Sequence, residues 1–157
     1  MFRIFNGRFI GENISFDPPE NYSLIVRRSE FPYDGVMFIS SDGSVKITVC
    51  FERDAVEEEQ SLHDFIEEND LYLYGDVFTV KRGARTAWAA YYGFELGGAG
   101  EYKEVFNFYK NTNLENQVTV TVELLRWRRT RTGNIYEVMD LPQVKNFFES
   151  IAYHGYK

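Results

Sequence analysis

The sequence predicts an α+β fold organised around an antiparallel β-sheet. The longest alternation of apolar and polar residues runs from Gln117 to Leu124, and a period of two is typical of a half-buried strand. A second strict alternation occupies 45–51. Apolar residues recur at helical spacing in two other segments, 55–68 and the stretch that follows Asp140. Strands and helices are therefore both expected, with the strand that starts at Gln117 at the centre of the sheet.

The first third of the chain is expected to contribute short strands. Residues 2–10 are predicted to form a hairpin, because the Asn-Gly pair at 6–7 accepts the positive φ that both turn positions require. A strand is expected at 14–16, and the two prolines at 18–19 end it. Another short strand is expected at 23–28.

A second hairpin and a helix follow. The predicted strands 36–39 and 45–51 are joined by a turn at 41–43, where Ser, Asp and Gly favour a tight bend. The helix is expected over 55–68, because Asp54 and a glutamate three residues later match the pattern of a capping box.

The second half of the chain predicts an antiparallel meander closed by a helix. Its four strands are expected at 77–81, 86–94, 104–110 and 117–126. The closing helix is expected to take Asp140 as its N-cap, with Pro142 in the first turn, where a missing N–H costs least. No internal repeat or linker interrupts the pattern, so residues 1–157 are expected to form a single domain.

The composition narrows the class of protein. Hydrophobic residues make up 44% of the 157 residues, which is enough to form a sizeable core. The net charge of −7 argues against a general nucleic-acid binder, which normally has a basic surplus. Cys50 is the only cysteine, so an intrachain disulfide is impossible. No signal sequence or membrane-length apolar run is apparent, so a cytoplasmic protein that does not bind membranes is expected.

Several short motifs, taken in order along the chain, resemble the PsbP-like superfamily. They are Ile14-Ser15-Phe16 with Pro18-Pro19, Gly83-Ala84-Arg85-Thr86-Ala87, and Phe148-Glu149-Ser150-Ile151. The resemblance covers roughly residues 13–152 and implies an antiparallel sheet with helices on both faces, an α/β/α sandwich. It also implies a protein-binding role, since members mostly bind other proteins and are not generally enzymes. The hairpin at 2–10 and the lack of an export signal depart from the family pattern.

The strongest candidate binding residues lie at the end of the predicted central strand. They are Arg126, Trp127, Arg128, Arg129 and Arg131. Four arginines around a tryptophan are suited to binding phosphates or carboxylates. The meander places three glutamates at the same end of the sheet, Glu95, Glu101 and Glu104. Local charge pairing is therefore the alternative interpretation of the arginine cluster.

No residue is assigned to catalysis, to a metal or to a cofactor. The glycine-rich loop at 97–100 precedes a predicted strand, whereas a dinucleotide fingerprint requires a helix there. His63 lies in the predicted acidic helix without a second histidine or cysteine at ligand spacing. Three functions remain open: a non-catalytic protein-binding or accessory domain, a small-molecule or anion-binding protein or hydrolase with an aromatic pocket, and a toxin-neutralising immunity protein.

Overall fold

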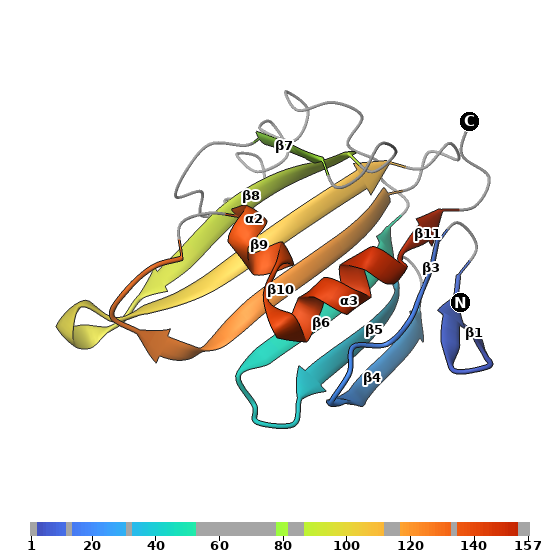
Figure 1. The fold of residues 1–157 in the computed structure, drawn as a ribbon, viewed down its shortest axis with the longest axis horizontal. Coiled ribbons are helices and arrows are strands. Elements are labelled where there is room, and N and C mark those ends of the chain that lie inside the picture. Colours follow the sequence, from blue (N-terminus) through green and yellow to red (C-terminus); the bar gives the residue numbers. More distant parts are fainter. Residues whose placement is uncertain are drawn as a thin grey trace.

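A seven-stranded antiparallel sheet forms the main body of the protein (Figure 1). The computed structural model describes residues 3–11, 14–30, 33–52, 78–81, 87–111, 117–132 and 135–153. In spatial order the strands are β4 (Tyr22–Glu30), β5 (Tyr33–Ser40), β6 (Val45–Glu52), β10 (Gln117–Arg128), β9 (Tyr102–Asn111), β8 (Ala87–Leu96) and β7 (Phe78–Lys81). The predicted central strand, β10, is in fact the middle strand of this sheet.

A second, four-stranded sheet joins the two ends of the chain. Its order is β1 (Arg3–Phe5), β2 (Arg8–Ile10), β3 (Ile14–Phe16) and β11 (Ala152–Tyr153). The predicted hairpin is confirmed, because Asn6 and Gly7 have φ values of 49° and 75° between β1 and β2. The hairpin predicted at 2–10, which departs from the family pattern, is therefore one half of this four-stranded sheet.

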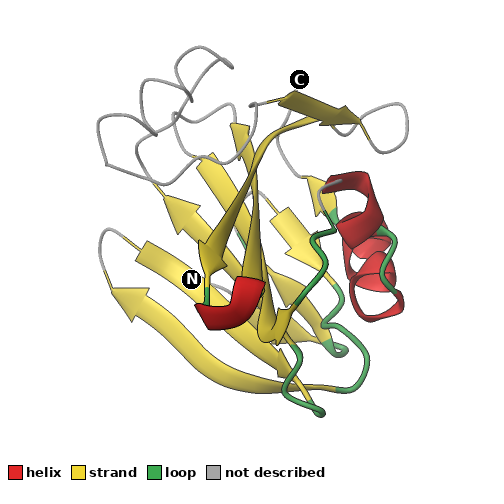
Figure 2. Ribbon diagram, turned by 90° about the vertical axis from the view of Figure 1, so that its left-hand side faces the viewer, coloured by secondary structure: helices red, strands yellow, loops and turns green. Residues whose placement is uncertain are grey.

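Two short helices lie over the same face of the large sheet (Figures 1 and 2). They are α2 (Ile135–Met139) and α3 (Pro142–Ser150), and a 3-10 turn, η1 (Gly98–Gly100), connects β8 to β9. Pro142 lies in the first turn of α3 as predicted, but the N-cap is Leu141 rather than Asp140. Leu141 makes no side-chain capping bond, so the packing of the apolar face must hold this end of the helix.

The main core consists of rows of side chains that cross the large sheet. One row runs through five strands by direct pairing and contains Phe38, Ile47, Val122, Phe106 and Tyr92. The adjacent row contains Val36, Val49, Val120, Phe108 and Ala90. All ten residues are buried, so the predicted alternation of β6 and β10 is confirmed.

Aromatic rings join the small sheet to this core. Phe16 on β3 lies 5.5 Å from Phe9, 6.3 Å from Phe38 and 5.2 Å from Phe147 of α3, measured between ring centroids. The Phe9 and Phe16 rings are stacked, and the other two contacts are edge-to-face. One side chain thus contacts both sheets and a helix.

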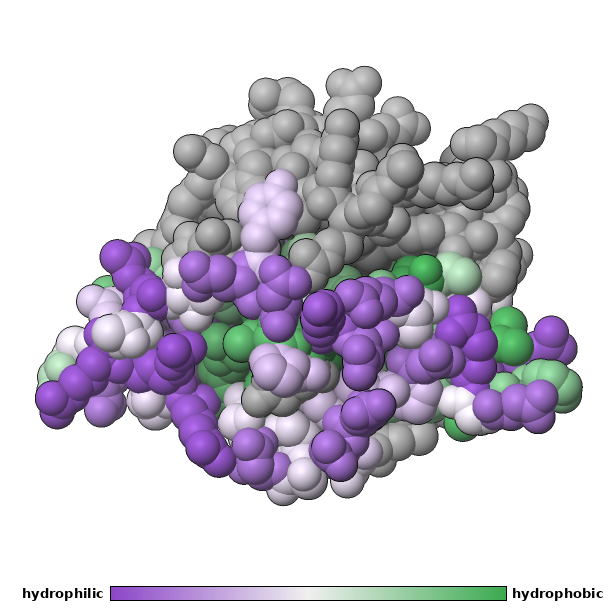
Figure 3. Space-filling model, viewed as in Figure 1, coloured by the Kyte–Doolittle hydropathy of each residue, from purple (hydrophilic) through white to green (hydrophobic). Residues whose placement is uncertain are grey.

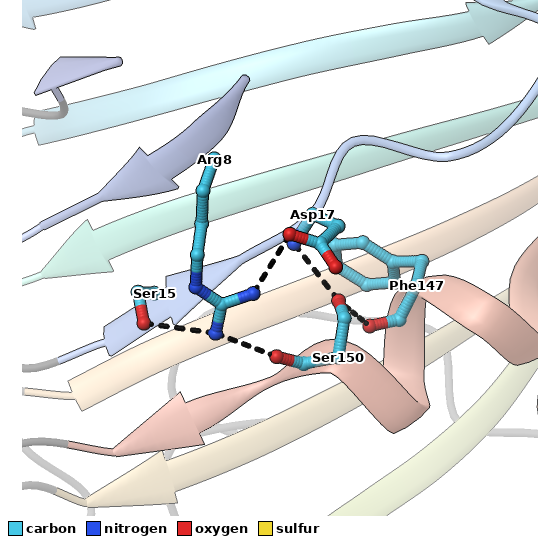
Figure 4. Close-up of polar contacts among 5 residues, drawn as sticks. All are labelled: Arg8, Ser15, Asp17, Phe147 and Ser150. Carbon is cyan, nitrogen blue, oxygen red and sulfur yellow. Dashed lines mark hydrogen bonds and ion pairs between the residues drawn. The ribbon is translucent and has the colours of Figure 1, made fainter. Parts of the chain in front are cut away.

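A polar network fixes the N-terminal hairpin to the end of α3 (Figure 4). Arg8 donates hydrogen bonds to Asp17 Oδ1, Ser15 Oγ and the Ser150 carbonyl, at 2.9, 3.0 and 2.8 Å. The Ser150 hydroxyl accepts from Asp17 N and donates to the Phe147 carbonyl. A guanidinium against the last carbonyl of a helix complements the helix dipole. This network holds β2, β3 and α3 together at the edge of the core.

The prediction of an α+β fold with the sheet flanked by helices in an α/β/α sandwich is wrong. Strands dominate the described residues, which form two antiparallel sheets, and their two short helices cover one face of the larger sheet. The small sheet occupies part of the layer that the sandwich would assign to helices, because β1, β2 and β11 pair onto β3. The predicted helix at 55–68 lies outside the described residues.

Candidate functional site

The large sheet has a basic tip, which we define as residues 94–104 and 125–132. Pairing of β10 with β6 ends at Leu124, and the last part of β10 pairs only with β9. Figure 1 shows β8, β9 and β10 extending past β6 at this end, and Figure 3 shows that mostly hydrophilic residues cover it. All five arginine-cluster residues predicted from the sequence lie on the basic tip.

The arginines of the basic tip point to separate partners. Arg126 Nη2 donates to the carbonyl of Asp42 in the β5–β6 turn at 2.9 Å. Arg128 Nη1 lies 3.7 Å from Glu104 Oε2 and 3.3 Å from the Thr132 hydroxyl. The predicted neighbourhood of the cluster is therefore confirmed for Glu104. Arg126 and Arg128 nevertheless do not converge on one point.

Arg131 stacks on two aromatic rings of the tip. Its guanidinium carbon lies 4.7 Å from the Phe94 ring centroid and 5.2 Å from that of Tyr102, both distances typical of cation–π contacts. Arg129 is exposed and makes no ion pair or hydrogen bond with the described residues. It is therefore the arginine of the cluster most available to a partner.

Trp127 is held in place by a glycine. A Cβ atom built on Gly97 would lie 2.7 Å from Trp127 Cζ3, so the indole packs directly on the backbone, where only glycine leaves room. Lys103 Nζ lies 5.0 Å from the ring centroid. The residue Trp127 is still 42% exposed. Trp127 is thus an ordered aromatic side chain on the molecular surface.

A buried carboxylate anchors the tip. Glu104 has a fully buried side chain and shares the core face of the sheet with Leu124 and Phe94. It accepts hydrogen bonds from Tyr92 Oη at 2.5 Å and from the backbone N and hydroxyl of Thr132 at 2.6 and 2.9 Å. Burial, together with the Glu104 carboxylate, raises the pKa of Tyr92, so this phenol remains a proton donor. Glu104 therefore fixes the segment that leads from β10 towards α2.

The burial of Glu104 could have been predicted from the alternation of β9. Glu104 is two and four residues from Phe106 and Phe108, so all three side chains lie on one face of a strand. A carboxylate on the face of two buried phenylalanines must find hydrogen-bond donors. The sequence interpretation placed Glu104 beside the arginines but did not use this alternation.

A pocket of about 400 Å³ lies between the β5–β6 turn and the start of α3. It is lined by Glu20, Asn21, Tyr22, Ser40, Ser41, Asp42 and Pro142. The sequence interpretation recognised the turn but not the pocket, because β4 and α3 reach it only through the tertiary fold. The serines that flank Asp42 are the one local signal, since such hydroxyls commonly hydrogen-bond a turn carboxylate.

Asp42 is fixed by its neighbours. Its Oδ1 atom accepts bonds from the Ser40 hydroxyl at 2.7 Å, the Ser44 backbone N at 2.9 Å and the Ser44 hydroxyl at 2.6 Å. The bonds from Ser44 and Ser40, with a smaller contribution from Arg126, lower the pKa of Asp42 from 3.8 to about 2. The carboxylate is therefore ionised at any physiological pH.

This pKa shift predicts a pH-dependent contribution to stability. A carboxyl group whose pKa is lowered by folding stabilises the protein above its unfolded pKa and loses that contribution as the pH falls through its folded pKa. We expect the melting-temperature difference between wild type and Asp42→Asn to be largest above about pH 4 and to shrink towards about pH 2. Thermal melts across this range measure it, with the exposed Glu149→Gln as control. A difference that stays constant with pH would contradict the assignment.

Two further properties concern the described part of the chain alone. Neither of its helices has the length and apolar character needed to cross a membrane. It also contains no group of three or more His, Cys, Asp or Glu side chains placed to hold a metal ion.

Comparison with known proteins shows a likeness of fold. No family model matches the sequence, and no curated protein matches it. A crystal structure of a Bacteroides thetaiotaomicron protein is similar, with a TM-score of 0.55 at 11% sequence identity. The match covers 90% of this chain and 45% of that protein, so the chain spans less than half of its length. At this identity the likeness concerns the fold alone.

Proposed function

We propose that this protein is a binding domain that recognises an acidic segment of a partner protein with its basic tip. The observation that supports the proposal is the exposure of two large apolar side chains on this tip, Trp127 at 42% and Leu96 at 65%. Tryptophan and arginine are both enriched among the few residues that supply most of the binding energy of protein interfaces.

The charge of the tip favours an acidic partner. Its five cations and three carboxylates give a formal charge of +2, in a chain whose formal charge is −7. One of those carboxylates, Glu104, is buried and satisfied by donors from the tip itself. The tip therefore presents positive charge to solvent on an otherwise acidic molecule, which steers acidic partners to this end.

The tip is also organised before any partner arrives. Gly97 and Lys103 hold the Trp127 ring, and the aromatic pair Phe94 and Tyr102 holds Arg131. A surface with ordered aromatic and arginine side chains loses less conformational entropy on binding than a mobile one. This preorganisation supports recognition of a partner.

The test uses a fluorescently labelled acidic peptide that contains leucine and phenylalanine between glutamates. We expect it to bind the wild-type protein, with affinity that falls as salt rises. Trp127→Ala should weaken binding by about 30-fold, the loss typical of an interface hot spot. Arg129→Glu should weaken it several-fold because a positive charge becomes negative. Fluorescence anisotropy measures these affinities.

Two controls distinguish binding by the basic tip from a general effect of the protein's net charge. Arg3→Glu makes the same charge reversal on exposed β1, outside the tip, and should leave the affinity nearly unchanged. A peptide with lysine in place of glutamate should not bind. If Arg3→Glu and Arg129→Glu weaken binding equally, or if Trp127→Ala has no effect, the basic tip is not the recognition surface.

The other functions predicted from the sequence stay predictions. An anion clamp would need the arginines to converge, whereas Arg126 bonds to the β5–β6 turn, Arg128 pairs with Glu104 and Arg131 stacks on Phe94. A toxin-neutralising role would be one form of partner binding, and a toxin gene beside the gene for this protein would favour it. The resemblance to the PsbP-like superfamily, with its protein-binding members, also remains a prediction.

A further inference from the structure

The middle strand of the large sheet, β10, lies at an edge of that sheet over its last residues. Its pairing with β6 ends at Leu124, and one more backbone bond runs from Leu125 N to the Ser44 carbonyl at 2.8 Å. The strand nevertheless continues past β6 to Arg128 (Figure 1). Within the described chain no strand pairs with residues 126–128 on that side, and all three are exposed. We call these three residues the open edge.

The backbone of the open edge is also irregularly paired on its other side. The register between β10 and β9 shifts between Leu124 and Arg128. Such a bulge leaves the extra residues of the bulged strand outside the regular ladder of hydrogen bonds. Exposed N–H and C=O groups at a strand edge are a template on which an extended segment can add as a further strand. The open edge therefore offers main-chain hydrogen bonds to a partner.

The side chains of the open edge lie on both faces of the sheet. Arg128 pairs in register with Tyr102 and lies 3.7 Å from Glu104 Oε2, so it is on the core face. Trp127 is on the opposite face with Lys103, whose Nζ lies 5.0 Å from the ring centroid. Successive side chains of an added strand would also alternate between these faces. Every second residue of such a strand would lie on the face of Trp127, and the others on the face of Arg128.

The charge of the open edge determines which kind of strand fits it. Arg126 and Arg128 flank Trp127, and the exposed Arg129 follows directly. Two copies of this edge would bring their arginines together, so like charges oppose pairing with a second copy of the chain. A strand that carries acidic residues meets the same arginines with opposite charge. An acidic segment is therefore the occupant that the edge favours.

From this geometry we propose that the basic tip binds its acidic segment as an added β-strand, paired with the open edge and in line with β6. The segment alternates apolar with acidic residues, so that the apolar side chains contact Trp127 and the acidic ones lie beside Arg128. This inference rests on the function proposed for the basic tip. It specifies that the partner is held through its main chain as well as its side chains.

The test places one N-methyl group at successive positions of a labelled peptide in which glutamate alternates with leucine or phenylalanine. In an added strand the N–H groups of alternate residues point towards β10 and the others point to solvent. Methylation at every second position should therefore weaken binding at least about tenfold, because a hydrogen bond is lost. Methylation at the intervening positions should change the affinity by less than about twofold. Fluorescence anisotropy measures both sets.

A peptide of the same composition, with its glutamates in one block and its apolar residues in another, is the matched control. It has the same charge without the alternation and should bind at least about tenfold more weakly. Hydrogen exchange adds a readout on the protein. At least one backbone N–H of residues 126–128 should exchange more slowly in the complex, whereas that of Ile4, on edge strand β1, should not change.

The outcomes distinguish this inference from the function on which it rests. If the alternating peptide binds but the effect of N-methylation does not alternate along it, the added strand is wrong and the basic tip remains the recognition surface. Equal binding of the block peptide, or unchanged exchange throughout 126–128, would also overturn the added strand alone. If the alternating peptide does not bind at all, the proposed function and this inference both fail.

Discussion

Phe16→Ala is expected to lower the free energy of unfolding by about 4 kcal/mol, the loss typical of a phenylalanine truncated in a well-packed core. Phe16 has no exposed surface, and its ring contacts Phe9, Phe38 and Phe147. Those rings belong to the small sheet, the large sheet and α3. They cannot all move into the cavity, because each is also held by its own element. Chemical denaturation followed by circular dichroism measures the change.

Phe5→Ala is the matched control for this prediction. Phe5 is 64% exposed in β1, so the same truncation should change stability by less than about 0.5 kcal/mol. If Phe16→Ala were as mild as Phe5→Ala, the small sheet would not be an integral part of the core. The small sheet would then contribute little to the stability of the fold.

Glu104→Ala is expected to destabilise the protein by about 3 kcal/mol, although it removes a charged group from the core. The substitution leaves the buried Tyr92 hydroxyl and the partly buried Thr132 backbone N without their acceptor. Unpaired buried donors lose their full hydration free energy, which outweighs the benefit of removing one carboxylate. Arg128 also loses its partner, but its side chain is 46% exposed and water can replace that contact.

Two further variants test whether the effect of Glu104→Ala comes from its buried hydrogen bonds. Glu149→Ala removes an exposed glutamate that lies 3.9 Å from Lys145, and it should cost less than about 0.5 kcal/mol. Glu104→Gln retains a carbonyl acceptor and should fall between the two. If Glu104→Ala had no more effect than Glu149→Ala, the hydrogen bonds to Tyr92 and Thr132 would not anchor the tip.

Local patterns were sufficient to predict most of the strands. The alternation gave the correct buried faces at 45–49 and 118–124, and the Asn-Gly pair gave the correct turn. The small sheet, which forms the second layer of the fold, could not be predicted from local patterns. The two residues of β11 are too short to show a period, and they become a strand only because β3 lies beside them. The α/β/α sandwich was implied by the resemblance to the PsbP-like superfamily, and no local pattern could correct it, since an edge strand of two residues has no signal of its own.

In the candidate sites too, features local in the sequence could be predicted, and features that depend on the tertiary fold could not. The Arg126–Arg131 cluster is contiguous, so its composition was visible, and the meander correctly placed it at the end of the sheet that holds Glu104. Side-chain direction was not visible, because irregular pairing between Leu124 and Arg128 sends neighbouring arginines to different partners. The pocket joins β4, the β5–β6 turn and α3, which lie far apart in the sequence. No local pattern brings those segments together.

The bond from Arg8 to the Ser150 carbonyl spans 142 positions of the chain, and this separation has a kinetic consequence. Closing so long a loop loses chain entropy before any contact compensates for it. The hairpins of both sheets form between neighbouring segments, whereas the packing of α3 and β11 against β3 requires this long closure, so that packing should form after the rate-limiting step of folding. Phe16→Ala should then mainly accelerate unfolding and leave the folding rate nearly unchanged, which stopped-flow measurements can show. The small sheet would thus determine the unfolding rate, and with it the lifetime of the folded protein.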